Sequence, residues 1–145
     1  MITEVYDLET LSNLFTYTGY CLQNKQWYQF VIHKERNDAE LLYAHLKRDK
    51  VMFQVGFNNE NFDYPLEHYF LTNYNSKFKY FTGQDIAVDL YNKAQSLINS
   101  EEYTAIKDSN KFIKQYDLFQ IWHYNNKARM TSLKKKKKTG RCRRP

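Results

Sequence analysis

Apolar and polar residues alternate through the first quarter of the chain, and this pattern predicts β-strands. Three segments, 2–8, 14–22 and 27–33, are rich in β-branched and aromatic residues. The short polar stretches TLSN and QNK separate them, as turns separate antiparallel neighbours. We therefore expect these segments to form a three-stranded antiparallel unit.

The hydrophobic period then changes to that of a helix. In segment 37–49 the leucines recur at helical spacing, and Asn37 or Asp38 is suited to cap the helix. With Asn37 as the cap, Glu40 stands where a capping box needs an acid. Further along, the pattern predicts a buried strand at 51–57, helices at 64–74 and 84–99, and another strand within 111–124.

This order of elements predicts an α/β fold, with a mixed sheet of three antiparallel strands followed by parallel strands and flanked by helices. Parallel strands need long crossover connections, and the predicted helices supply them. In such sheets the functional groups tend to lie at strand ends and in the loops beyond them.

Composition narrows the class of protein. The chain has 145 residues, 42% hydrophobic and 17% aromatic, which indicates one folded domain with a core. We find no run of 18 apolar residues and no secretory signal, so we expect no membrane span and an intracellular location. Cys21 and Cys142 are too few for a disulfide framework, which favours a reducing compartment. The Cys and His spacings match no structural zinc site, and the scattered histidines indicate no hydrolase triad.

The net charge of +6 comes from one end of the sequence. Residues 134–145, KKKKKTGRCRRP, hold eight basic residues and no acid; without them 14 basic residues face 16 acids, or −2. We expect this tail to be solvated and disordered, and to bind polyanions in a salt-dependent way. A second hypothesis is a shifted reading frame, since an A-rich tract encodes lysines. A downstream DNA sequence with no polymerase reading frame in any register would exclude that hypothesis.

Two acidic stretches carry the candidate chemistry. Asp7 and Glu9 lie two residues apart in the first strand, so both project to one side of it. Asp63 lies where a helix begins after the buried strand, and it reaches the pair if the two strands are neighbours. Converging carboxylates suit Mg²⁺ or Mn²⁺, and two such ions hydrolyse phosphodiesters. The alternatives are a solvent-facing pair and a helix-terminal Asp63.

These stretches resemble a known family. YDLET looks like the first motif, Asp-x-Glu, of the 3′–5′ proofreading exonuclease domain of family-B DNA polymerases, and NNENFD looks like the second. The strings VGFNNENFDYPLEHYF and YDLFQIWHYNNKARMTSLK are similar to that domain in viral and phage-like polymerases. The resemblance covers residues 2–133, and it implies an RNase H-like fold acting in DNA replication, in the cytoplasm or a viral replication compartment.

The resemblance also implies roles for individual residues. Asp7, Glu9 and Asp63 would bind the catalytic Mg²⁺ or Mn²⁺ ions. Thr10, Asn59 and Phe62 match positions that contact the single-stranded 3′ end of DNA, where a Phe stacks on the terminal base. For Phe62 the alternative is an apolar anchor at the start of the helix.

One family motif has no counterpart in the sequence. The third motif, Tyr-x-x-x-Asp, supplies the last metal ligand in the family, and no such spacing occurs here. Asp117 falls in the predicted last strand, where we interpret it as a structural or supporting acid. The resemblance thus predicts residues 1–133 to be an incomplete exonuclease-like domain, with a doubtful second metal site and the remainder of a polymerase as a possible partner.

Two functional classes follow. The first is a 3′–5′ exonuclease module, weakened by the missing ligand, that hydrolyses single-stranded DNA ends. The second is a catalytically inactive remnant that binds DNA or a partner. An unrelated RNase H-like binding module is a third reading, in which no metal binds near Asp7.

Overall fold

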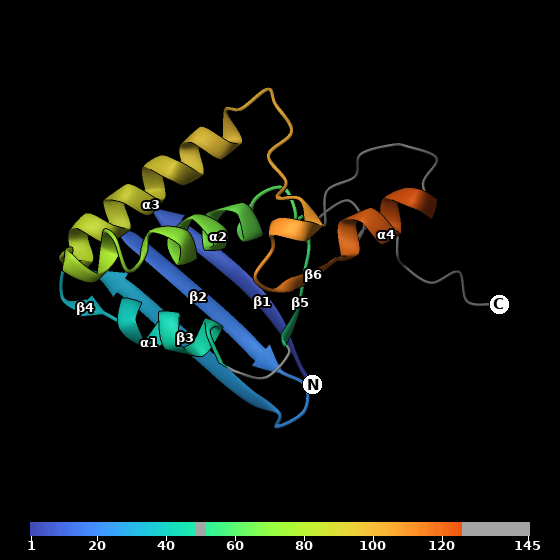
Figure 1. Cartoon of the computed structure of the whole chain (residues 1–145), viewed down its shortest axis with the longest axis horizontal. Helices are drawn as coiled ribbons and strands as arrows, with labels where there is room; N and C mark the ends of the chain where they lie inside the picture. Colours follow the sequence, from blue (N-terminus) through green and yellow to red (C-terminus); the bar gives the residue numbers. More distant parts are fainter. Residues whose placement is uncertain (49–51, 126–145) are drawn as a thin grey trace, which may run out of the picture.

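The computed structural model describes residues 1–48 and 52–125, which form an α/β fold around one mixed sheet (Figure 1). The sheet has six strands in the order β4-β3-β2-β1-β5-β6. The strands are β1 (Ile2–Leu11), β2 (Leu14–Cys21), β3 (Gln26–His33), β4 (Arg36–Asn37), β5 (Met52–Gly56) and β6 (Lys114–Asp117). The helices are α1 (Ala39–Leu46), α2 (Asp63–Asn73), α3 (Gly83–Ile98) and α4 (Leu118–Asn125), with short 3₁₀ turns η1 (Phe78–Tyr80) and η2 (Asp108–Asn110).

The strand pairing confirms the predicted topology. β1 pairs antiparallel with β2, and β2 pairs antiparallel with β3. On its other side β1 pairs in parallel with β5, which in turn pairs in parallel with β6. The sheet is therefore mixed, and the strand carrying Asp7 and Glu9 lies directly beside the strand that leads to Asp63.

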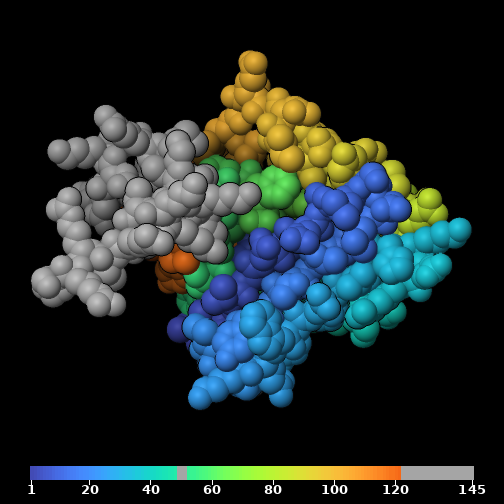
Figure 2. All heavy atoms as spheres, turned by 180° about the vertical axis from the view of Figure 1, so that it is seen from behind, coloured from blue at the N-terminus to red at the C-terminus, as the bar shows by residue number. Residues whose placement is uncertain are grey.

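The core lies between the sheet and one layer of helices. Side chains from β1, β2, α1, α2 and α3 form a single buried apolar cluster, and α1, α2 and α3 lie over the same face of the sheet (Figure 1). Every second residue of β2 is buried, as a strand covered on one face requires. Seen from behind, β1–β3 are open over much of the opposite face (Figure 2).

Several boundaries differ from the sequence predictions. The first helix is shorter than 37–49 and begins at Ala39, so Asp38 and not Asn37 holds the N-cap position. The Asp38 side chain makes no capping bond, because it accepts hydrogen bonds from the Val31 amide and Arg36 Nε. Asn37 Oδ1 accepts from the Ala39 amide. Segment 111–124 contains the predicted strand β6, but it continues into helix α4, which the alternation of aromatic residues did not indicate.

No helix in the described residues is long and apolar enough to cross a membrane. The predicted basic tail, residues 134–145, lies outside the described residues, as do the last residues of the predicted domain, 126–133.

Candidate active site

The side-chain alternation of β1 separates its acids into two environments. Tyr6 and Leu8 are buried against the helices, so Asp7 and Glu9 project from the opposite side and are exposed. The prediction that Asp7 and Glu9 share one side of the strand is confirmed. Partial burial and the neighbouring charge of Glu9 raise the pKa of Asp7, while a hydrogen bond from the Leu8 amide opposes that rise.

β5 is shorter than β1, so the edge of β1 near Asp7 and Glu9 has no paired strand from β5. The parallel pairing stops at Val5 and Val55, whereas β1 continues to Leu11. The chain leaves the sheet at Gly56 and enters α2 at Asp63. The start of α2 thereby approaches the part of β1 that carries Asp7.

Asp63 and Asp7 lie close enough for the charge of Asp7 to act on Asp63, although the two acids come from different elements. Burial raises the pKa of Asp63 to about 7, and the charge of Asp7 adds to the rise; the Leu8 hydrogen bond opposes it, and the charge of Asp117 adds a smaller increase. The fold therefore brings together two acids from distant parts of the sequence, and it places no compensating cation among the groups that shift either pKa.

Asp117 fixes the loop that leads to Asp63. It is buried at the end of β6, and its carboxylate accepts hydrogen bonds from the amides of Asn58 (2.7 Å), Glu60 (3.2 Å) and Phe119 (2.9 Å). The bond to Phe119 caps the start of α4. The interpretation of Asp117 as a structural acid is thus confirmed: it joins the β5–α2 loop to the last described helix.

Asn59 occupies the interior of that loop. Its side chain is fully buried and donates to Gln115 Oε1 at 2.8 Å, and its main-chain oxygen accepts from the Tyr64 amide. Gly56 allows this close approach, because a Cβ there would lie 2.9 Å from the Asn59 side chain. Asn59 thus supports the loop from inside, and its side chain is not exposed to a DNA strand as the sequence had predicted.

The other two predicted DNA contacts are accessible. Phe62 immediately precedes α2, packs partly against the core and lines a cavity of about 520 Å³, together with residues of the segment that follows α3. Its role as an apolar anchor is therefore visible, and its predicted stacking on a base stays a prediction. Thr10 is half-buried near the end of β1, opposite Phe15 of β2.

Within the described ranges, no group of three or more His, Cys, Asp or Glu side chains is arranged to hold a metal ion. The charge of Asp7 acts on Asp63, and burial makes the charged form of both acids unfavourable. A hard cation is the kind of partner that would offset two such carboxylates. Binding of Mg²⁺ or Mn²⁺ by these residues stays a prediction.

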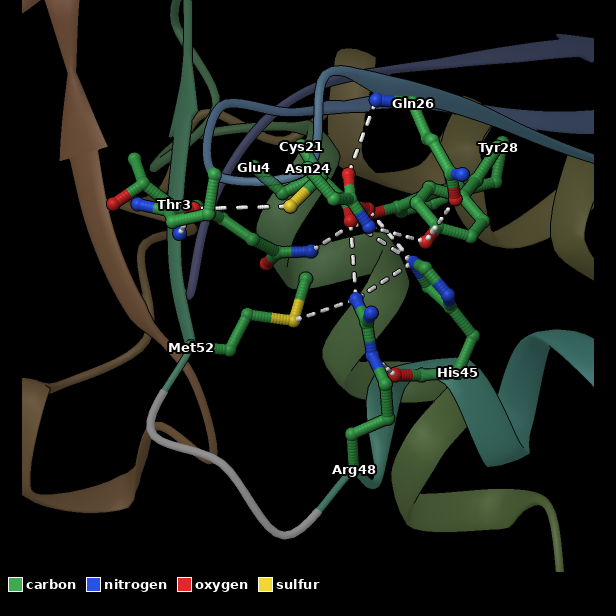
Figure 3. A network of polar contacts seen from close by, with 12 residues as sticks. Thr3, Glu4, Cys21, Asn24, Gln26, Tyr28, His45, Arg48 and Met52 are labelled. Carbon is green, nitrogen blue, oxygen red and sulfur yellow. Dashed lines mark hydrogen bonds and ion pairs between the residues drawn. The ribbon is translucent and has the colours of Figure 1, made fainter. Parts of the chain in front are cut away.

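Sequence reasoning missed a buried polar network on the other side of β1 (Figure 3). Glu4 is fully buried; its carboxylate accepts from the Tyr17 hydroxyl, and it lies 2.8 Å from His45 Nε2 and 3.1 Å from Arg48 Nη2. Burial alone would raise the pKa of Glu4, but the hydrogen bonds from His45 and Tyr17 and the charges of His45 and Arg48 lower it. Glu4 shares the strand parity of Tyr6 and Leu8, and this signal was available in the sequence.

The network continues through amides to a second buried acid. Gln54 donates to the Tyr17 hydroxyl and, at 2.7 Å, to Glu67 Oε1, and Gln115 donates to Gln54 Oε1. Burial raises the pKa of Glu67 to about 8; the Gln54 hydrogen bond opposes this rise, and the charges of Glu4 and Asp63 add to it. Burial therefore favours the neutral form of Glu67, which lies one helical turn beyond Asp63.

Comparison of the chain with protein-family models, with curated proteins and with solved structures finds no significant match. A functional assignment must therefore proceed from the residues and the geometry described above.

Proposed function

We propose that this chain is an RNase H-like 3′–5′ exonuclease module that acts on single-stranded DNA ends, with Asp7 and Asp63 as its metal-binding acids and Glu9 beside them. Its hydrolytic activity is weak because the third motif of the family it resembles has no counterpart in the sequence. The proposal rests on the two sequence motifs and on one observation in the fold.

That observation is the proximity of Asp63 to Asp7, whose charge raises the pKa of Asp63. Two carboxylates from separate elements repel each other when they come close, so solvent-facing carboxylates without a function are expected to lie apart. Here the β5–α2 loop, held by three hydrogen bonds to Asp117 and Lys111, carries Asp63 to Asp7 against this repulsion. Such an arrangement is typical of a site that binds a cation.

The roles of the residues follow from their positions. When bound, Mg²⁺ or Mn²⁺ lowers the pKa of a coordinated water and stabilises charge on a phosphodiester. Asp7 and Asp63 would hold the ion, since the charge of one acts on the other. Exposed Glu9 increases the negative potential at Asp7. Phe62 and the cavity of about 520 Å³ beside it offer an apolar surface to a terminal base.

The second candidate is an inactive module that binds a DNA end or a partner without cleaving it. The possible metal ligands favour this candidate, because the described residues provide the two carboxylates of Asp7 and Asp63 and no third ligand. Loss of transition-state charge stabilisation would lower the rate while leaving binding of the DNA end in place.

A direct assay separates the two candidates. A 5′-labelled single strand is incubated with the full chain and Mn²⁺ or Mg²⁺, and its length is followed by electrophoresis. An exonuclease shortens the strand stepwise from the 3′ end, and Asp7→Asn and Asp63→Asn reduce the rate by about 100-fold or more. The matched control is Glu35→Gln, which removes an exposed carboxylate from the β3–β4 turn.

The binding outcome needs a second readout, because a basic tail binds any polyanion. A strand blocked at its 3′ end by a phosphate is compared with a free 3′-hydroxyl strand in fluorescence anisotropy with Mn²⁺. Intact substrate together with a preference for the free 3′ end that Asp63→Asn abolishes selects the inactive binding module. Intact substrate without any end preference contradicts both candidates.

A further inference from the structure

A row of apolar side chains crosses the sheet on the face that α1, α2 and α3 leave open. Residues paired across five neighbouring strands supply this apolar row, in the order Trp27, Tyr20, Val5, Val55 and Tyr116 from β3 to β6. Alternation along the strands turns them away from the helices, as the burial of every second residue in β1, β2 and β5 shows. The row spans four interstrand spacings, or about 19 Å.

The apolar row is open to solvent. Trp27 is 73% exposed, Val5 41% and Tyr116 51%, while Tyr20 and Val55 are half-buried. The Trp27 ring is tilted against that of Tyr20, with centroids 4.9 Å apart, so the two rings form one surface. Figure 2 shows this face of β1–β3 uncovered. Single exposed apolar residues are ordinary, but a contiguous row marks a surface that contacts another molecule.

Charges of opposite sign lie on the two sides of the apolar row. Asp7 and Glu9 face outward on one side of it, toward the C-terminal end of β1. On the other side, Lys114 of β6 stands opposite Phe53, and its Nζ lies 5.5 Å from the centroid of that ring. Lys25, in the turn between β2 and β3, lies on the same side as Lys114. Among the described residues, none of these four charged groups takes part in an ion pair.

This arrangement matches a second copy of the same chain. Two sheets pack face to face through their apolar side chains. A two-fold axis along the apolar row lays one row on the other, and it places the basic side of each copy over the acidic side of its partner. A purely apolar partner would instead leave these charges covered and without counterions, at a cost in free energy.

We propose that the chain forms a weak homodimer through the outward face of its sheet, with the two apolar rows in contact. The contact area is small for a specific complex, so we expect a dissociation constant of about 10–100 µM. The acidic side is covered in the dimer, so a DNA end would reach Asp7 only in the monomer. The proposal does not rest on the exonuclease assignment, because neither a metal ion nor DNA takes part in the association.

Association is tested on the full chain by sedimentation equilibrium at protein concentrations from about 5 to about 500 µM. EDTA is present, so that divalent ions at the acids play no part. The measurement is repeated at about 0.15 M and about 1 M NaCl. We expect a monomer–dimer equilibrium at both salt concentrations, because the apolar contact is not screened by salt.

Variants at the apolar row locate the interface. Trp27→Thr keeps a residue suited to a strand, and it is expected to weaken the dimer at least about tenfold. Tyr116→Thr should weaken it in the same direction at the other end of the row. The matched control is Tyr80→Thr, which removes a ring that is 77% exposed in η1, and it should leave the dissociation constant unchanged. Thermal unfolding of each variant confirms that it is folded.

Charge reversal tests how the two copies are oriented. Glu9→Lys and Lys114→Glu should each weaken the dimer about tenfold, because each brings like charges together across the interface. The double variant exchanges the two charges, and it should recover most of the wild-type affinity.

Three results would overturn the proposal. The first is a chain that stays monomeric over the whole concentration range. The second is a dimer that neither Trp27→Thr nor Tyr116→Thr weakens. The third is an association that disappears at about 1 M NaCl, which would assign it to the basic residues at 134–145 rather than to the apolar row. A double variant weaker than both single variants would refute the orientation set by the two-fold axis.

Discussion

Strand β1 carries two acidic sites a few residues apart, Glu4 and Asp7, and the fold shifts their pKa values in opposite directions. At Glu4 the strand faces the helices, and Tyr17, His45 and Arg48 supply hydrogen bonds and positive charge that lower the pKa of the buried acid. The Asp7 side chain faces outward and lies near Asp63. Burial raises the pKa of both acids, and the charge of Asp7 raises the pKa of Asp63 further.

The difference separates a structural acid from a candidate functional one. A buried carboxylate that serves stability needs partners for its charge, since an unpaired ion in the interior is costly. Acids brought together without such partners destabilise the fold, and proteins tolerate that cost mainly at sites of function. The Asp7–Asp63 region fits the second description.

The largest effect is expected from removing the compensation at Glu4. Arg48→Met keeps the apolar stem near Met52 but removes the cation, and we expect it to lower the free energy of unfolding by about 4 kcal/mol. Urea denaturation measures the change. In the double variant with Glu4→Gln the loss should be smaller, because no buried charge is left unpaired. Equal losses in the single and double variants would mean that charge compensation is not the reason for the network.

Removing one of the uncompensated acids should have the opposite sign. Asp63→Asn is expected to raise the free energy of unfolding at pH 8 by about 2 kcal/mol, roughly half of what a pKa shift from 3.8 to about 7 corresponds to. The reduction allows for relaxation and for the lost charge at the helix N-terminus. A destabilising effect at pH 8 would show that the Asp63 charge is compensated after all.

The pH dependence of stability follows from the same shifts. The folded state holds protons on Asp63 and Glu67 up to pH values of about 7 and about 8, while the unfolded state releases them near 4. The contribution of these two groups to stability is therefore full at low pH and is lost as pH rises toward 8. Asp63→Asn should reduce this slope, and Glu67→Gln should reduce it further, in urea denaturation from pH 5 to 8.5. A wild-type stability that is constant or rises over this range contradicts the shifts.

A smaller effect is expected from a divalent ion. At pH 8, Mn²⁺ at about ten times its dissociation constant should stabilise the wild-type chain by about 1.4 kcal/mol, because binding favours the folded state. Asp7→Asn should abolish this gain, and Glu35→Gln should keep it. The shift in melting temperature measures both. Equal stabilisation of all three proteins would place the ion elsewhere.

The smallest effect is expected at Glu9, which faces outward beside Asp7. Glu9→Gln removes the neighbouring charge that raises the pKa of Asp7, so the pKa of Asp7 should move back toward its ordinary value. Stability should change little, since both side chains are exposed. Carboxyl carbon shifts in an NMR titration report the pKa directly. An unchanged Asp7 would show that Glu9 points elsewhere in solution.

Local patterns predicted most of the architecture. The alternation in 14–22 and 27–33 and the helical spacing in 84–99 correspond to β2, β3 and α3 within a residue or two. In 111–124 they predicted the strand, which is β6, but not the helix that follows it directly. There the Asp117 carboxylate caps the helix while it also binds the β5–α2 loop, a contact between segments far apart in the sequence.

The candidate site divides in the same manner. The local periods of strand and helix are enough to predict that Asp7 and Glu9 share one side of β1 and that Asp63 begins a helix. They do not predict that Asp63 lies near Asp7, that Asn59 is buried, or that Glu4 pairs with His45 and Arg48. These features depend on burial and on charges from distant segments, which a local period does not contain.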